Sequence, residues 1–251
     1  MNSSVENWPR SYYRSGGGDA FLFYVVYGPI PQNFSISRSK YRCDGILEGV
    51  NVSSYGPTSK PEAVGTFRSG YLWEEFQRAN VKLANDVANQ SECLVIRGTI
   101  SDPSDLNYLR NAVGLVAFCL DSGAVAIFDP QMFKWWTPSE WRTWIFDPAS
   151  AVPTHHIVIL TSEDENGTEW FHTRGMRKFG RPDLSVHRVS ADLRDGVIDL
   201  LNRFIEFQAF GGIIEEGQEI KMRSLPPGMI CAHQGNLDDP DFNNVHVEVK
   251  W

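Results

Sequence analysis

The sequence of 251 residues lacks the long apolar segment that a membrane-spanning helix requires. No run approaches the roughly 18 consecutive apolar residues that mark such a helix. The N-terminal segment, MNSSVENWPRSYYRSGGGD, has no apolar core of the kind found in secretory signal peptides. We therefore expect a cytoplasmic protein without a membrane partner.

The sequence also lacks the common signatures of catalytic sites. It contains no G-x-S-x-G, no G-x-x-x-x-G-K-[ST], no H-E-x-x-H and no H-x-E followed by P-C-x-x-C. The triple glycine at residues 16–18 precedes an apolar strand, whereas a phosphate-binding loop joins a strand to a helix. These absences exclude only the families that the patterns describe. We expect no catalytic residue and no cofactor.

Cysteine is scarce, and the four residues are scattered along the chain as Cys43, Cys93, Cys119 and Cys231. No two of them form a C-x-x-C pair, so neither a zinc site nor a disulfide framework is indicated. Cys231 and His233 would share a strand face, which leaves a thiolate–imidazole pair open. His155 and His156 would point to opposite faces of a strand and could not easily share a metal. We expect no metal site.

Basic residues are fewer than acidic ones: the sequence has 23 Lys and Arg and 31 Asp and Glu, which gives a formal net charge of −8. General nucleic-acid binders usually carry a basic patch and a high pI, so we expect no nucleic-acid partner. An acidic surface instead favours encounter with a basic partner. The candidate partner-binding carboxylates are Glu215, Glu216, Asp238, Asp239 and Asp241. The alternative interpretation places them in solvated turns.

Tryptophan is abundant, and four of the eight lie within ten residues, at Trp135, Trp136, Trp141 and Trp144. The sequence Thr137-Pro138-Ser139-Glu140 is a capping box with proline at the first helical position. The short helix that follows should end at Asp147, because a proline comes next. Trp135 and Trp136 are either core side chains or candidate partner-binding residues, since tryptophan dominates both settings.

Hydrophobic periodicity predicts three long helices, at about 69–89, 103–120 and 192–210. Strands are predicted at 20–27, 94–100, 124–128, 156–162, 168–173, 184–189, 219–223 and 245–250. Because strands and helices mix without regular alternation, we predict an α+β fold with a mixed, mainly antiparallel sheet on which the helices pack. We expect a single domain over residues 1–251 with a loose segment at 1–19. An N-terminal β subdomain at 20–68 stays open.

A glycine-punctuated loop at residues 174–183, RGMRKFGRPD, concentrates four basic side chains, those of Arg174, Arg177, Lys178 and Arg181. Its two glycines would let the backbone approach a ligand, so the loop is a candidate anion site. His172 and His187 border it and could serve as a base. The other interpretation is a solvated loop that pairs with the protein's own acids.

The segment TRGMRKFGRPDLSVHRV at residues 173–189 resembles the T-x-G-[ML]-x-x-F-G-x-x-[ED]-L segment of bacterial domains related to suppressor-of-fused. The tryptophan-rich segment, with Asp129-Pro130, is similar to bacterial polymorphic-toxin immunity proteins of α+β fold, in particular those that neutralise restriction-endonuclease-like toxins. The resemblance covers about residues 94–210 and carries over no individual functional residue. It implies a non-enzymatic cytoplasmic protein that binds and blocks a cognate toxin, in the setting of systems such as type VI secretion.

Three hypotheses follow for the function. The first is an immunity protein that binds a basic, possibly nuclease, toxin. The second is a hydrolase or transferase that acts on an anionic substrate through the Arg174–Arg181 loop, and the third is an oligomeric scaffold. The sequence does not fix the oligomeric state.

Overall fold

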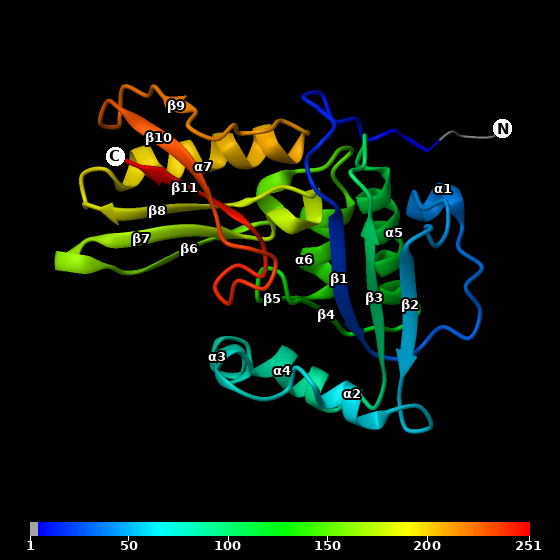
Figure 1. The fold of residues 1–251 in the computed structure, drawn as a ribbon. Coiled ribbons are helices and arrows are strands. Elements are labelled where there is room, and N and C mark those ends of the chain that lie inside the picture. The colour runs from blue at the N-terminus through cyan, green and yellow to red at the C-terminus, as the bar shows by residue number, and fades with distance from the viewer. Residues whose placement is uncertain (1–4) are drawn as a thin grey trace. The chain divides into compact units, whose positions relative to one another are not determined.

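The computed structural model describes residues 5–251 and shows an α+β protein with two mainly antiparallel sheets (Figure 1). The chain forms two compact units. The first unit holds the described residues up to Trp8 with Phe21–Ile100 and Leu106–Ala151, and the second unit holds Pro9–Ala20, Ser101–Asp105 and Val152–Trp251. The predicted α+β class is confirmed, although the strands form two sheets where we expected one. The single domain stays a prediction.

The first unit contains a five-stranded sheet with the strand order β2-β3-β1-β4-β5. Its strands are β1 (Ala20–Tyr27), β2 (Val50–Tyr55), β3 (Cys93–Ile100), β4 (Ala126–Asp129) and β5 (Lys134–Trp136). β2 pairs with β3, and β1 pairs with β4, both antiparallel. Since β1 and β2 each pair with later strands, residues 20–68 do not form the separate β subdomain that the sequence left open.

The helices of the first unit pack against this sheet. They are α1 (Arg38–Tyr41), α2 (Pro61–Gly65), α3 (Tyr71–Ala79), α4 (Val81–Ala88), α5 (Asn107–Asp121), α6 (Pro138–Glu140) and the π-helical turn η1 (Trp141–Phe146). α5 is buried along almost its whole length and runs behind β3 in Figure 1. On the other side, Trp73 of α3 and Leu83 of α4 join one core cluster with Val25 and Tyr27 of β1.

The long helix predicted over residues 69–89 is two helices. The chain breaks at Asn80, whose φ of −144° and ψ of 73° are not helical. The Asn80 carboxamide oxygen accepts a hydrogen bond from the Leu83 amide at 3.1 Å and caps α4. The buried face of α3 also differs from the predicted one, because Leu72 is 41% exposed while Trp73 is 7% exposed. α5 begins later than predicted, at Asn107. Because the segment at 69–89 is split, the described residues contain two long helices, α5 and α7, where three were expected.

The start of the short tryptophan-rich helix is confirmed. The Thr137 hydroxyl accepts from the Glu140 amide at 3.1 Å, and the Glu140 carboxylate accepts from the Thr137 amide at 2.9 Å. This reciprocal capping box satisfies two amides that a helix N-terminus otherwise leaves unpaired. The helical segment ends at Phe146, directly before Asp147-Pro148, as the proline rule predicts.

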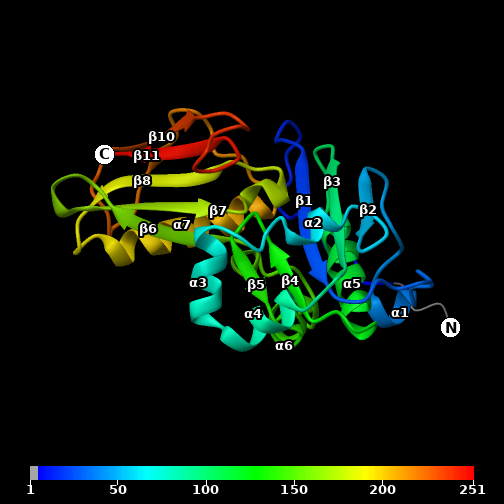
Figure 2. The same ribbon diagram turned by 90° about the horizontal axis from the view of Figure 1, so that it is seen from below.

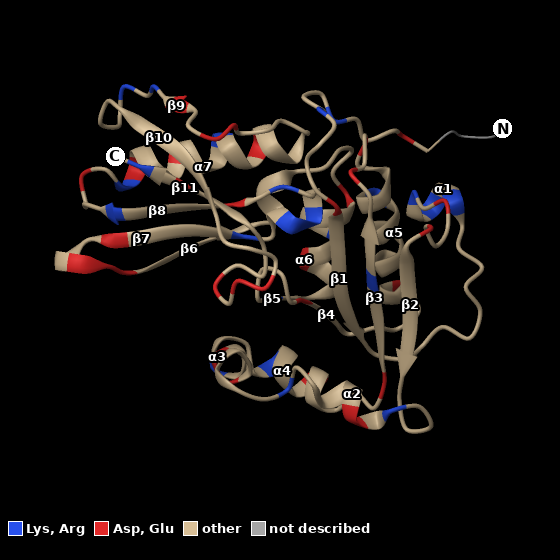
Figure 3. Ribbon diagram, in the orientation of Figure 1, with Lys and Arg blue, Asp and Glu red and all other residues tan. Residues whose placement is uncertain are grey.

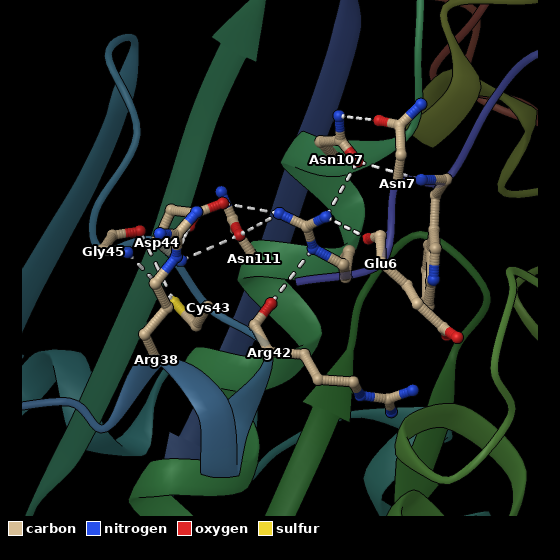
Figure 4. A network of polar contacts seen from close by, with 11 residues as sticks. Glu6, Asn7, Arg38, Arg42, Cys43, Asp44, Gly45, Asn107 and Asn111 are labelled. Carbon is tan, nitrogen blue, oxygen red and sulfur yellow. Dashed lines mark hydrogen bonds and ion pairs between the residues drawn. The ribbon is translucent and has the colours of Figure 1, made fainter. Parts of the chain in front are cut away.

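A buried arginine joins three segments of the first unit (Figure 4). Arg110 of α5 is 4% exposed. Its Nε donates to the Arg42 carbonyl at 3.0 Å, and Nη2 donates to the Asp44 carboxylate at 2.6 Å. Its Nη1 donates to the Glu6 carbonyl and to the Asn107 carboxamide oxygen. The N-terminal segment and the loop after α1 are therefore both fixed to α5.

The segment expected to be loose carries two buried anchors among its described residues. Trp8 is buried in the first unit, and its indole N–H donates to the Ala149 carbonyl at 2.8 Å. Arg10 is buried in the second unit and donates to the carbonyls of Phe179 and Ala209 at 2.8 and 3.0 Å. Residues 5–19 are thus tied to later parts of the chain, and residues 1–4 lie outside the described part.

The second unit contains a six-stranded sheet with the strand order β6-β7-β8-β11-β10-β9. Its strands are β6 (Val158–Glu163), β7 (Glu169–Arg174), β8 (Asp183–Val189), β9 (Glu219–Ile220), β10 (Met229–Gln234) and β11 (His246–Lys250). Only the β8–β11 pair among these is parallel. The predicted hairpin around Asn166-Gly167 joins β6 to β7, and both residues have positive φ, of 56° and 76°.

One long helix, α7 (Arg194–Ala209), runs along one face of the six-stranded sheet (Figures 1 and 2). The short 3₁₀ turns are η2 (Pro153–His155), η3 (Glu165–Gly167) and η4 (Met176–Phe179). Among residues 5–251, no helix combines the length and the apolar character that crossing a bilayer demands.

Strand alternation gives this sheet one apolar and one polar face. Phe171 lies opposite Val186, and both are buried, as is Val247 on β11. These residues share the face on which the apolar side of α7 can pack. The neighbouring position on β7, His172, lies opposite Ser185 and belongs to the other face. The polar face carries the candidate site.

Candidate partner-binding face

Five aromatic rings form a continuous row on the polar face of the second sheet. The ring of His187 stacks on Trp170 with centroids 4.9 Å apart, and Trp170 stacks on His172 at 4.0 Å. Phe242, from the loop before β11, meets His172 edge-on at 5.5 Å and stacks on His246 at 4.1 Å. We call these five residues the histidine–tryptophan row.

The row follows from the alternation of two paired strands and from one loop. Trp170 and His172 are two residues apart on β7, and His187 is two residues after Ser185 on β8. The indole N–H of Trp170 donates to the Ser185 hydroxyl at 2.8 Å, which fixes the ring against the sheet. The loop that carries Phe242 is joined to β7, because the Arg174 guanidinium donates a hydrogen bond to the Asp241 carbonyl.

Carboxylates border the row at both ends. Asp164, beside the β6–β7 turn, lies 3.0 Å from Nδ1 of His187, and Asp239 lies 3.9 Å from Nδ1 of His246. Figure 3 shows acidic residues at that turn and in the loop that leads into β11. Glu248 of β11 lies opposite Ser185 of β8, and its charge and that of Asp241 act on His246. We call Asp164, Asp239, Asp241 and Glu248 the acidic rim.

The side-chain pKa values of two histidines in the row and of Asp164 in the rim are shifted by their surroundings. Burial, together with the nearby charge of Arg174, lowers the pKa of His172 to about 4. Burial likewise lowers the pKa of His246. The amides of Arg188 and Glu165 donate to Asp164 and hold the pKa of its carboxyl below the usual range. These pKa shifts favour uncharged side chains at the buried His172 and the half-buried His246, and an ionised carboxylate at Asp164.

Three of the carboxylates predicted to bind a partner lie in the loop that borders this face. Asp238 and Asp241 are exposed, whereas Asp239 is half-buried. The Asp239 Oδ1 accepts from the Asp241 amide at 2.9 Å and shapes the loop, while its Oδ2 faces His246. The loop therefore combines a structural carboxylate with two that point to solvent.

The other two predicted carboxylates, Glu215 and Glu216, lie in the turn before β9. Glu215 lies 3.5 Å from Arg14, and Glu216 accepts from the His233 amide at 2.6 Å. Both groups thus have partners within the chain, and they belong to a different loop from the row.

The predicted tryptophan pair is used in the core of the first unit. Trp136 is 2% exposed. Trp135 stacks on Phe76 with centroids 4.6 Å apart and on Phe128 at 4.4 Å. Because adjacent strand residues face opposite sides, the two indoles pack on the two faces of β5. The burial of Trp136 and the stacking of the half-buried Trp135 on core rings speak against a direct role in partner binding.

The cations of the glycine-punctuated loop are turned inward. Main-chain carbonyl groups accept hydrogen bonds from all four, Arg174, Arg177, Lys178 and Arg181. The Lys178 ammonium is buried and donates to the His156 carbonyl at 2.8 Å, and Arg181 donates to the Gly211 carbonyl at 3.0 Å. These contacts fasten the loop to its own unit and speak against an anion site there.

The thiolate–imidazole pair that the sequence left open at Cys231 and His233 finds little support. Burial raises the pKa of Cys231 to about 11, so its side chain is a thiol and not a thiolate at neutral pH. All four cysteines are buried and free. Within the described part of the chain, no group of three or more His, Cys, Asp or Glu is placed to hold a metal ion.

Sequence reasoning missed the row as a unit. His172 and His187 were recognised only as neighbours of the basic loop, and Trp170 and Phe242 carried no signal of their own. The pattern that could have revealed it is the pair of alternations Trp170-x-His172 and Ser185-x-His187 on two strands that pair.

No family model, no curated protein and no solved structure matches the chain, so the geometry of this face carries the functional argument.

Proposed function

We propose that the protein binds another protein through the histidine–tryptophan row and its acidic rim, and that it is an immunity protein that neutralises a basic toxin. The observation that supports the proposal is the half-buried Trp170–His187 stack bordered by carboxylates. Tryptophan is enriched among the residues that dominate interfaces, and opposite charge around it selects the partner.

The chemistry of the face matches the side chains of a basic protein. A lysine or arginine of the partner can pack its aliphatic stem against the half-buried edge of the row and reach Asp164 or Asp241 at the rim with its charged end. A nuclease toxin must attract phosphates with basic groups, and the carboxylates of the rim can occupy the positions of those phosphates. The segment with the suppressor-of-fused resemblance, residues 173–189, supplies β8 of this same sheet.

The alternative is an enzyme that acts on an anionic substrate through the Arg174–Arg181 loop. One contact favours it, because His187 and Asp164 are 3.0 Å apart, as in a general base with its orienting carboxylate. The cations of that loop nevertheless donate to main-chain carbonyls and do not converge on His187. We therefore place this function second.

Affinity capture of the tagged protein from its native host tests the proposal. We expect one stoichiometric basic protein, identified by mass spectrometry, which is released as salt rises because screening weakens charge pairs. Co-expression of the protein with that partner should restore growth that the partner alone inhibits. Capture of no protein at low salt, or no rescue of growth, would contradict the immunity role.

A charge-reversal variant locates the interface. Asp241→Lys with Glu248→Lys changes two side chains of the rim, and we expect the captured partner and the growth rescue to be lost. Glu74→Lys with Glu75→Lys is the matched control, because both side chains reach solvent on α3 of the first unit, with 59% and 45% of their surface exposed. Equal capture by both double variants would place the interface elsewhere.

A further inference from the structure

The first unit has an open groove of about 600 Å³ on its sheet. Phe21, Phe23 and Arg97 line it. Because residues two apart on a strand share a face, Phe21 and Phe23 lie on the same side of β1 as Val25 and Tyr27. The core cluster of α3 and α4 includes Val25 and Tyr27, whereas the end of the strand with Phe21 borders the groove. The volume falls within the range of about 300–1,000 Å³ that is typical of small-molecule sites.

An exposed arginine stands in this groove. The Arg97 guanidinium carbon lies 5.4 Å from the ring centroid of Phe21 and 5.6 Å from that of Phe23. In residues 5–251, the side chain of Arg97 has no ion pair and no hydrogen bond in addition to these ring contacts. Its guanidinium donors are therefore available to a ligand, unlike those of the inward-turned arginines of the second unit.

The surroundings of Arg97 combine polar and aromatic groups. Asn51 lies directly opposite Arg97 on β2 and is exposed, and Thr99 follows on the same face of β3. Phe67 closes the aromatic side, with its ring 5.9 Å from that of Phe23 and edge-on to it. The groove thus offers ring surface on one side and hydrogen-bonding groups on the other.

We infer that this groove binds a small molecule that joins a flat ring to an anionic group. The ring lies against the phenylalanine side chains, and the anion receives two parallel N–H donors from Arg97. A nucleoside monophosphate and an aromatic carboxylic acid share this chemistry. The inference concerns a surface of the first unit and is independent of the proposed role of the histidine–tryptophan row.

Amide chemical-shift titration of the full-length, ¹⁵N-labelled protein tests the inference and separates the two sources. One arm uses the four common nucleoside 5′-monophosphates, and the other uses benzoate and indole carboxylates. Adenosine, phenol and inorganic phosphate serve as the ring-only and anion-only probes. We expect saturable shifts in β1, β2 and β3 from one arm, with affinity at least about tenfold above those probes, since charged hydrogen bonds contribute this much. Saturation by neither arm, or equal binding of inorganic phosphate, would overturn the inference.

Two variants show whether Arg97 carries the binding. Arg97→Gln should weaken the affinity of the bound compound at least about tenfold, and Arg97→Lys should weaken it less, because the charge remains while the paired donors are lost. Lys82→Gln, which removes an exposed cation of α4 in the same unit, is the matched control and should bind as the natural protein does. The urea midpoints of all three variants report whether the fold is kept. Unchanged affinity in a folded Arg97→Gln protein would overturn the inference.

Discussion

Asp183, at the start of β8, is a completely buried carboxylate that joins three segments of the second unit. It accepts from the Thr173 hydroxyl at 2.8 Å, from the Met176 amide at 3.2 Å and from the Asn244 side-chain amide at 2.9 Å. Burial raises its pKa to about 6, although these three hydrogen bonds act in the opposite direction. Desolvation therefore outweighs the hydrogen bonds at this residue.

Stability should consequently carry a pH signature of Asp183. Between about pH 4, where an unfolded aspartate loses its proton, and about pH 6, the folded protein binds more protons than the unfolded chain. The free energy of unfolding then falls as pH rises, by up to about 3 kcal/mol across this window. Asp183→Asn cannot titrate, so the difference in unfolding free energy between the natural protein and the variant should change by this amount.

Urea unfolding of both proteins at pH 4, 5, 6 and 7 measures that difference. Other titrating groups, such as the buried His156 with its pKa lowered to about 3, act in both proteins and cancel. Any constant offset from the altered hydrogen bonds is independent of pH. A difference that stays flat from pH 4 to pH 6 would contradict the assignment.

At this scale the sequence identified residues better than it identified their roles. It named Arg174, Lys178 and Arg181 as the unusual cations of the chain, but composition cannot tell whether a donor will meet a ligand or a backbone carbonyl. For Trp135 the sequence left a core role and a binding role open, and the structure packs its ring against the core of the first unit. Burial decides between a core role and a binding role, and it depends on strand pairing, which the local sequence does not determine.

The helix pair α3–α4 shows the same limit for whole elements. Apolar residues such as Phe76, Leu83 and Val87 recur at helical spacing on both sides of the break, so periodicity predicted one continuous helix. The side chain of Asn80 instead hydrogen-bonds to the backbone and starts a new helix. Helix propensity and capping therefore make opposite predictions for this position.

Asn80→Ala distinguishes them. Alanine is the better helix former, yet we expect the variant to be about 1 kcal/mol less stable, because the cap of α4 is lost. Asn85→Ala, at an exposed position inside α4, is the control and should be neutral or slightly stabilising. Denaturant midpoints of the two variants give the comparison, and an Asn80→Ala protein more stable than the natural one would contradict the cap.

Strands were predictable where an apolar run or a turn signal marks them, and not where the strand is half exposed and bordered by loops. β1, β3 and the β6–β7 hairpin follow from apolar runs and a turn signal. β9 lies at the start of the strand predicted over residues 219–223. β5 has only three residues, and β2 and β10, which are partly exposed, were not placed from the sequence. The histidine–tryptophan row was missed for a related reason, since it depends on which strands pair.

The whole molecule is organised as two interleaved units, and Arg10 is the clearest sign of it. Residues 9–20 belong to the second unit although the next eighty residues of the chain belong to the first. Arg10 donates to the carbonyls of Pro103, Phe179 and Ala209, which come from three distant segments of its own unit. The single domain predicted from length says nothing about this interleaving.

Replacement of Arg10 should therefore weaken the second unit strongly. Arg10→Met leaves buried carbonyl groups without their donor, and we expect a loss of about 3 kcal/mol or more in the free energy of unfolding. Arg14→Met is the matched control, because the side chain of Arg14 is 64% exposed and pairs only loosely with Glu215 at 3.5 Å. It should change stability by less than about 0.5 kcal/mol. Similar urea midpoints for the two variants would contradict the predicted contribution of Arg10 to the stability of the second unit.

The interleaving also determines the order in which the two units can fold during synthesis. Arg10 and its acceptor at Ala209 are separated by 199 residues. At a synthesis rate of about 5–20 residues per second, Ala209 is added roughly 10–40 s after Arg10. All residues of the first unit have been added by Ala151, so that unit can fold while the N-terminal arm is still waiting. A ribosome that stalls after the first unit has emerged but before Ala209 is added therefore holds a chain with a complete first unit and a second unit that lacks one acceptor of Arg10.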